Sequence, residues 1–117
     1  MVINQGDLYW VDLGEPRGSE PGFRHPFVVI QNDAFNKSKI NTVVVCSLSS
    51  NIKLSQAPGN VLLKKGEANL PKASVVNVSQ VMTLNKDELG LKIGQLSKKR
   101  VEEVIEGFQF LLKPRIL

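Results

Sequence analysis

Side chains able to transfer a proton or bind an anion gather in three short stretches of the sequence. The first is the Gly- and Pro-rich loop before an apolar run, and it contains Ser19, Glu20, Arg24 and His25. His25 is the only histidine, and an imidazole can act as an acid or a base near neutral pH. A guanidinium binds phosphate or carboxylate through paired hydrogen bonds. This stretch therefore offers acid–base chemistry beside an anion-binding group.

The other two stretches are uncharged. They comprise the hydroxyl and amide residues that directly follow one apolar run or lie inside a later one: Ser49, Ser50, Asn51, Asn77, Ser79 and Gln80. Such groups can donate hydrogen bonds to an anion or to the edge of a base. The same residue types are also common in turns and on the solvent face of strands. A groove shared by these two stretches is therefore a hypothesis.

Signatures of several other chemistries are missing. The sequence has no G-x-x-x-x-G-K-[ST] phosphate-binding motif and no HExxH motif, and Cys46 is its only cysteine. One cysteine and one histidine do not make up a structural zinc site, so we expect no metal and no cofactor. A lone cysteine also excludes an internal disulfide and fits a reducing cytoplasm.

The composition is typical of one globular domain. The 117 residues are 42% hydrophobic and 22% charged, and the net charge is +4, so we expect a single domain over residues 1–117. No apolar run approaches the ~20 residues of a membrane span, and residues 1–10 lack the pattern of an export signal. We therefore expect a cytoplasmic protein with no membrane partner. The mild basic excess permits a nucleic-acid partner without requiring one.

The elements that must position these side chains are mainly strands. Apolar, β-branched and aromatic residues alternate or run together between turn residues, which predicts strands over 7–13, 26–31, 41–48, 60–64, 74–83 and 91–96. A long loop is expected over 14–25. Asn32 and Asp33 can cap a short helix over 34–38.

The C-terminal segment follows a helical pattern. Ser97 can cap a helix that ends near Lys113, before Pro114. Apolar residues at helical spacing form one stripe that we expect to be core: Val101, Val104, Ile105, Phe108, Leu111 and Leu112. The chain should therefore fold as a mainly β protein, a small twisted barrel or strongly bent sheet, with a C-terminal helix packed on it.

Four segments in this order resemble the MazF/PemK family of toxin endoribonucleases. They are GDLYWVDL (6–13), GSEPGFRHPFVVIQND (18–33), TVVVCSLSSN (42–51) and LPKASVVNVSQVMTLNK (70–86). The resemblance implies an SH3-like β-barrel with a C-terminal helix, of the kind shared with the CcdB toxin. It also implies a homodimer that cleaves single-stranded RNA at a short sequence without a metal, and a small antitoxin partner that occludes the active groove.

The resemblance also assigns roles to residues. The family's hydroxyl residue at the end of its third strand falls on Ser49, and its arginine before proline falls on His25, which is a departure. We expect His25 to act as acid or base and Arg24 to bind the phosphate. The alternatives are that Arg24 alone replaces the family arginine, or that the nuclease is weakened. Glu20 matches the family's loop acid, and its role is that of a base, of a partner that orients Arg24, or of a structural residue of the loop.

Further RNA contacts are expected from Ser50, Asn51, Lys53, Asn77 and Gln80. If residues 24–25 are extended, the side chains of Arg24 and His25 point to opposite faces. Two functions of other classes remain open: a CcdB-like poison that binds DNA gyrase without cleaving anything, and a catalytically weakened RNA-binding domain.

Overall fold

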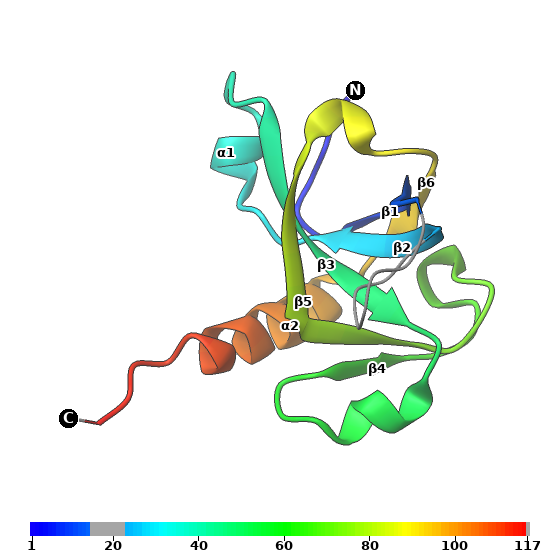
Figure 1. The fold of residues 1–117 in the computed structure, drawn as a ribbon, viewed down its shortest axis with the longest axis vertical. Coiled ribbons are helices and arrows are strands. Elements are labelled where there is room, and N and C mark those ends of the chain that lie inside the picture. The colour runs from blue at the N-terminus through cyan, green and yellow to red at the C-terminus, as the bar shows by residue number, and fades with distance from the viewer. Residues whose placement is uncertain (15–22, 117) are drawn as a thin grey trace.

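The computed structural model describes residues 1–14 and 23–116. Within them, a six-stranded antiparallel sheet carries the fold (Figure 1), with the strand order β4-β5-β3-β2-β1-β6. The strands are β1 (Asp7–Asp12), β2 (Arg24–Val29), β3 (Thr42–Ser49), β4 (Val61–Leu63), β5 (Ser74–Asn85) and β6 (Lys92–Gln95). The helices are α1 (Asp33–Asn36), α2 (Lys98–Leu111) and three short 3₁₀ turns, η1 (Ile52–Gln56), η2 (Glu67–Asn69) and η3 (Lys86–Glu88).

The sheet curves because β5 bends. Cys46 of β3 lies opposite Val81, whereas Leu48 lies opposite Val76. A single residue of β3 thus spans the four residues 77–80 of β5, and such a bulge bends a strand and increases its twist. Figure 1 shows β5 turning sharply between its two ends. The predicted mainly β fold, a strongly bent sheet with a C-terminal helix, is confirmed.

Both faces of the sheet are buried. Successive strand residues point to opposite faces, so Val28 joins the apolar cluster beneath α2, while Phe27 and Val29 join a second cluster on the other face. The continuous apolar runs of β2 and β3 follow from this two-sided burial.

Helix α2 covers one face and then continues past it. The Ser97 hydroxyl caps the helix by accepting a hydrogen bond from the Arg100 N–H. Val104 is buried, and Val101, Ile105 and Phe108 pack against the core. The predicted core stripe is wrong for its last two residues, because Leu111 and Leu112 are 47% and 63% exposed. Leu111 is the last residue of α2 and Leu112 its C-cap, and Figure 1 shows this end of α2 extending beyond the sheet.

Strand β2 begins two residues earlier than the sequence predicts. Arg24 pairs with Asp12, and His25 pairs with Val11 of β1. Both residues therefore belong to a strand rather than to the expected loop, and this fixes the direction of their side chains. No helix in the described part of the chain is long and apolar enough to cross a membrane.

Cys46 lies in the interior of the sheet. Its side chain is 1% exposed, and the thiol donates a hydrogen bond to the Asn77 carbonyl oxygen at 2.9 Å. Burial raises the pKa of this thiol to about 12.

Candidate active site

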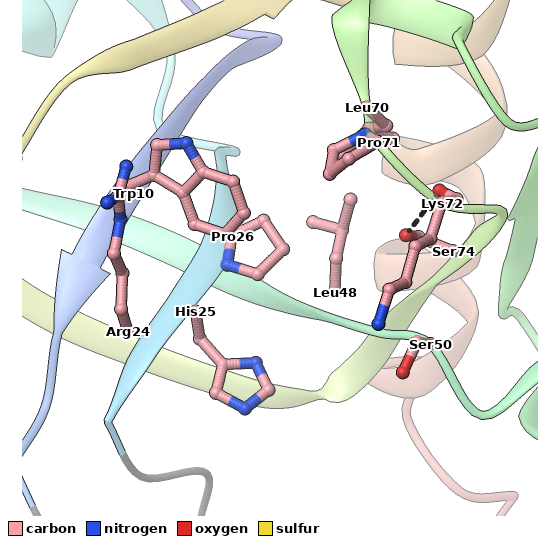
Figure 2. A pocket seen from close by; sticks show the side chains of 10 residues that line it. All are labelled: Trp10, Arg24, His25, Pro26, Leu48, Ser50, Leu70, Pro71, Lys72 and Ser74. Carbon is pink, nitrogen blue, oxygen red and sulfur yellow. Dashed lines mark hydrogen bonds between the residues drawn. The ribbon is translucent and has the colours of Figure 1, made fainter.

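A pocket of about 260 Å³ opens beside the start of β2. Trp10, Arg24 and Pro26 line one side, from β1 and β2. The opposite side is the segment that leads into β5, with Leu70, Pro71 and Lys72. Figure 2 shows the two walls facing each other, with Leu48 between them. The pocket therefore lies where strands β1, β2, β3 and β5 meet the segment that leads into β5.

Arg24 and His25 leave β2 in opposite directions. They are successive residues of a paired strand, so their side chains alternate across the sheet, as expected for extended residues. The Arg24 guanidinium lies over the Trp10 ring, with Cζ 4.6 Å from the ring centroid. The His25 ring points away from Trp10, toward the lower rim of the pocket in Figure 2. Both side chains nevertheless line the pocket.

The His25 ring has an unused nitrogen. Nδ1 is buried and has no hydrogen-bond partner among the described residues. A buried polar atom without a partner is rare because it loses its bonds to water. Such an atom at the wall of a pocket can accept or donate a proton when a substrate enters.

Ser49 lies near His25 along the sheet but does not line the pocket. Phe27 pairs with Ser47, and the same antiparallel register, continued by two residues, places His25 near the start of β2 opposite Ser49 at the end of β3. The Ser49 Oγ accepts a hydrogen bond from the Asn51 N–H at 3.1 Å. That bond leaves the hydroxyl proton free to be donated. Ser50 does line the pocket.

Asn51 and Lys53 begin the turn after β3. The Asn51 Oδ1 caps η1 by accepting from the Lys53 N–H at 3.3 Å. Asn51 thus has a structural role, and both side chains are exposed. Their predicted contacts with RNA stay predictions.

The third polar stretch lies elsewhere. Asn77 and Ser79 line a separate cavity of about 300 Å³ together with Asn60, Phe110 and Leu111. The Asn77 Oδ1 accepts hydrogen bonds from the Ser79 hydroxyl at 3.0 Å and from the Asn60 amide at 3.4 Å. This cavity shares no lining residue with the first. The structure therefore does not bring Asn77 together with His25. Gln80 lies in the bulge of β5 and lines neither cavity.

Of the residues that line this pocket, sequence reasoning singled out only Arg24, His25 and Ser50 and missed the aromatic, charged and hydroxyl side chains of Trp10, Lys72 and Ser74. Lys72 adds a second cation to the wall opposite Arg24, and the Ser74 hydroxyl donates to the Lys72 carbonyl oxygen at 3.0 Å. No carboxylate appears among the described residues that line this pocket, so its electrostatic character favours an anion. Glu20 lies outside the described residues.

The wall opposite Arg24 is held in place by residues distant in sequence. The Arg100 guanidinium of α2 forms an ion pair with Glu67 of η2 at 2.7 Å. Hydrogen bonds from Arg100 lower the pKa of the Glu67 carboxyl. The Asn69 side chain donates to the Ile93 carbonyl oxygen at 3.1 Å. A side chain at Gly94 would overlap the Ala68 carbonyl oxygen, so a glycine is required at this contact.

Across residues 1–14 and 23–116, no group of three or more His, Cys, Asp or Glu side chains could hold a metal ion.

Comparison with known proteins assigns the chain to a family. Residues 4–112 match the model of the PemK-like, MazF-like toxins of type II toxin–antitoxin systems. The chain is 42% identical to Endoribonuclease MazF2 of Mycobacterium bovis over 112 residues, which cover 96% of this chain and 98% of that protein. It is 38% identical to Endoribonuclease MazF of Staphylococcus saprophyticus over 103 residues, 88% of this chain and 85% of the relative.

Solved structures share the fold. A MazF structure from Deinococcus radiodurans superposes with a TM-score of 0.76 at 23% identity, covering 97% of this chain and 99% of the other. A mycobacterial endoribonuclease in complex with its cognate antitoxin gives a TM-score of 0.73 at 22% identity, covering 99% and 98%. The match over nearly the whole sequence agrees with the bent sheet and the C-terminal helix. The chain belongs to the PemK-like, MazF-like family of type II toxins.

Proposed function

We propose that this chain is the endoribonuclease toxin of a type II toxin–antitoxin system, and that it cleaves single-stranded RNA at a specific sequence without a metal. Such cleavage of mRNA would arrest translation and growth. The observation that carries the proposal is the cationic pocket that Arg24 and His25 both line, where the His25 Nδ1 has no hydrogen-bond partner among the described residues. The curated relatives named endoribonucleases support the same activity.

The reaction uses the 2′-hydroxyl of the RNA as its nucleophile. A base removes the 2′ proton while the oxygen attacks the adjacent phosphorus, and the bond from phosphorus to the 5′-oxygen breaks. An acid protonates that leaving oxygen. The products are a 2′,3′-cyclic phosphate and a 5′-hydroxyl end. Negative charge develops on the phosphoryl oxygens, where fixed cations and hydrogen-bond donors stabilise the transition state.

We assign these roles to two residues that line the pocket, Arg24 and His25, and to Ser49, which lies outside its lining. His25 acts as the acid or the base through its ring nitrogens. Arg24 binds the phosphate, which its fork of N–H groups fits. Ser49 donates its hydroxyl proton to a phosphoryl oxygen. The alternative is that Arg24 alone provides the cleavage function, and it predicts a near-normal kcat after substitution of His25.

The partners follow from the same proposal. We infer that a small antitoxin binds this chain, since related toxins have been solved in complexes with antitoxins. We also infer a cytoplasmic homodimer. Exposed apolar side chains at the end of α2, among them Phe110, Leu111 and Leu112, support a contact between protein chains. Light scattering should give twice the 12.9 kDa mass of the chain.

The decisive experiment is cleavage in the presence of a chelator. Purified protein is incubated with single-stranded RNA and EDTA, and the product ends are mapped. We expect fragments with 2′,3′-cyclic phosphate and 5′-hydroxyl ends, cut at one short sequence. Intact RNA at high protein concentration would reject the nuclease. RNA binding without cleavage would indicate a weakened member, and inhibition of DNA gyrase would indicate a CcdB-like poison.

A further inference from the structure

The η2 turn contains two successive residues in a backbone conformation that L side chains rarely adopt. Ala68 has φ 50° and ψ 33°, and Asn69 has φ 64°. This left-handed conformation is unfavourable for a residue with a Cβ, and more so for alanine than for asparagine. Such strain persists only where the surrounding structure holds the backbone in place, and it is concentrated at functional sites. The turn therefore needs contacts that hold it.

Helix α2 and strand β6 supply those contacts. The Arg100 guanidinium donates two hydrogen bonds to the Glu67 carboxylate, from Nε to Oε2 at 2.7 Å and from Nη2 to Oε1 at 3.2 Å. A paired contact of this kind fixes orientation as well as distance. Oε1 also accepts from the Lys64 N–H at 3.0 Å, and the Asn69 side chain is bonded to the Ile93 carbonyl oxygen. The turn is thus held on two sides.

The held turn leads directly into one wall of the pocket. Leu70 is buried, and the exposed residues Pro71 and Lys72 follow it. Figure 2 shows the Lys72 side chain on the wall that faces Arg24. A displacement of about 1 Å at a reacting group, caused by a change far from the chemistry, can cost about 10²-fold in rate. The position of this wall therefore matters for any phosphate bound between the two cations.

The strain argues against stability as the only role of the ion pair. Unfavourable dihedral angles at Ala68 and Asn69 subtract from whatever stability the contact between Arg100 and Glu67 contributes. An ion pair with no other role would gain nothing from holding a strained turn. A device that fixes the place of the following segment requires such a hold.

We propose that Arg100 and Glu67 are positioning residues for RNA cleavage. They hold the strained η2 turn, and through it they keep Lys72 opposite Arg24, where its ammonium group binds a phosphate of the RNA. When the ion pair is broken, Ala68 and Asn69 relax toward more favourable dihedral angles and the wall shifts. The inference rests on the proposed function, because Lys72 acts on the substrate of that reaction.

Two acids that both contact Arg100 make a matched test. Glu103 lies on α2 itself, 3.4 Å from the Arg100 guanidinium, whereas Glu67 lies on η2. Glu67→Ala and Glu103→Ala each remove one negative charge, and charge alone would make both variants bind the RNA polyanion slightly more tightly. We expect the opposite for Glu67→Ala, a fall in kcat/KM for single-stranded RNA of roughly 10- to 100-fold, and little change for Glu103→Ala. Glu67→Gln keeps an acceptor oxygen and should recover part of the loss.

A second substitution shows whether the effect passes through Lys72. In a Lys72→Gln background, Glu67→Ala should lower kcat/KM by no more than about 2-fold, since the group that the turn positions is already absent. Urea denaturation confirms that each variant is folded under the assay conditions.

Three results would overturn the inference: unchanged kcat/KM in folded Glu67→Ala, equal losses in Glu67→Ala and Glu103→Ala, or the full loss from Glu67→Ala in the Lys72→Gln background. All three leave cleavage by the wild type in place. RNA left intact by the wild type would instead reject the proposed function, and this inference with it, so the two failures are distinguishable.

Discussion

Arg24 crosses the β1–β2 pair and holds its guanidinium over the indole of Trp10, with Cζ 4.6 Å from the ring centroid. Trp10 lies opposite Pro26, so Arg24 is its diagonal neighbour on the same face of the sheet. A cation held over an aromatic ring has already lost part of its freedom of movement. The guanidinium is therefore positioned before any substrate arrives.

Arg24→Gln should weaken RNA binding more than it slows the chemical step. One phosphate contact would be lost, so the slope of log affinity against log salt concentration should fall by about 0.7. Arg24→Lys should restore the charge but not the planar contact with Trp10 or the paired hydrogen bonds. Fluorescence anisotropy of a labelled single-stranded RNA at several salt concentrations measures both effects. An unchanged salt slope in Arg24→Gln would remove Arg24 from the phosphate.

His25→Gln should lower kcat by about 10²- to 10⁴-fold, the usual contribution of a general acid or base. The affinity for RNA should change little, because the substitution keeps a polar side chain of similar size. Single-turnover cleavage and anisotropy on the same preparation separate the two quantities. Near-normal kcat in this variant would transfer the catalytic role to Arg24.

Ser49→Ala should reduce cleavage by about 10- to 100-fold, since a hydrogen bond to a charged group contributes roughly 1.5–3 kcal/mol. The effect should appear in kcat, because negative charge on the phosphate oxygens grows in the transition state. Ser79→Ala provides a matched control: Ser79 is a strand serine that lines the separate cavity. Equal losses in the two variants would contradict the assignment of Ser49.

The ion pair between Glu67 and Arg100 should make stability depend on pH in the acid range. Hydrogen bonds from Arg100 hold the pKa of the folded Glu67 carboxyl below its usual value of 4.5. A folded pKa below the unfolded one means that the stabilisation is fully present above about pH 4.5 and is lost as the pH falls through the folded value. We expect a contribution of about 1 kcal/mol near neutral pH.

Urea denaturation at a series of pH values between 7 and 3 tests this expectation. Glu67→Gln should lower the free energy of unfolding at neutral pH and make it fall less steeply on acidification. Glu102→Gln serves as the control, because Glu102 is an exposed acid on α2, the helix that carries Arg100. Parallel curves for wild type and Glu67→Gln would show that the ion pair does not produce the dependence.

Much of the fold could be predicted from the sequence because its signals are local. The apolar runs of β2 and β3 and the cap at Ser97 reflect periodicity and hydrogen bonding over a few residues. The error at Leu111 and Leu112 has a physical cause. Helical spacing shows which residues share a face of α2, but it does not show where the sheet beneath that face ends.

The candidate site was less predictable because it is built from distant segments. Arg24 and His25 could be singled out as chemically unusual, and their opposite directions follow from an extended backbone. The contact of Arg24 with Trp10 depends on the register of β1 against β2. Lys72 follows η2, whose Glu67 forms an ion pair with Arg100, 33 positions away in the sequence. No short-range sequence pattern encodes either relationship. Such a pattern also does not reveal that the bulge of β5 separates Asn77 from the pocket.

The buried thiol of Cys46 can report how often the sheet around it opens to solvent. Alkylating reagents react with the thiolate, which both burial and the pKa of about 12 suppress in the folded state. The chain has no other cysteine. The rate at which a thiol reagent modifies Cys46 therefore measures how often the strands at the centre of the sheet separate. A tightly bound RNA or antitoxin that stabilises the sheet would lower this rate of modification.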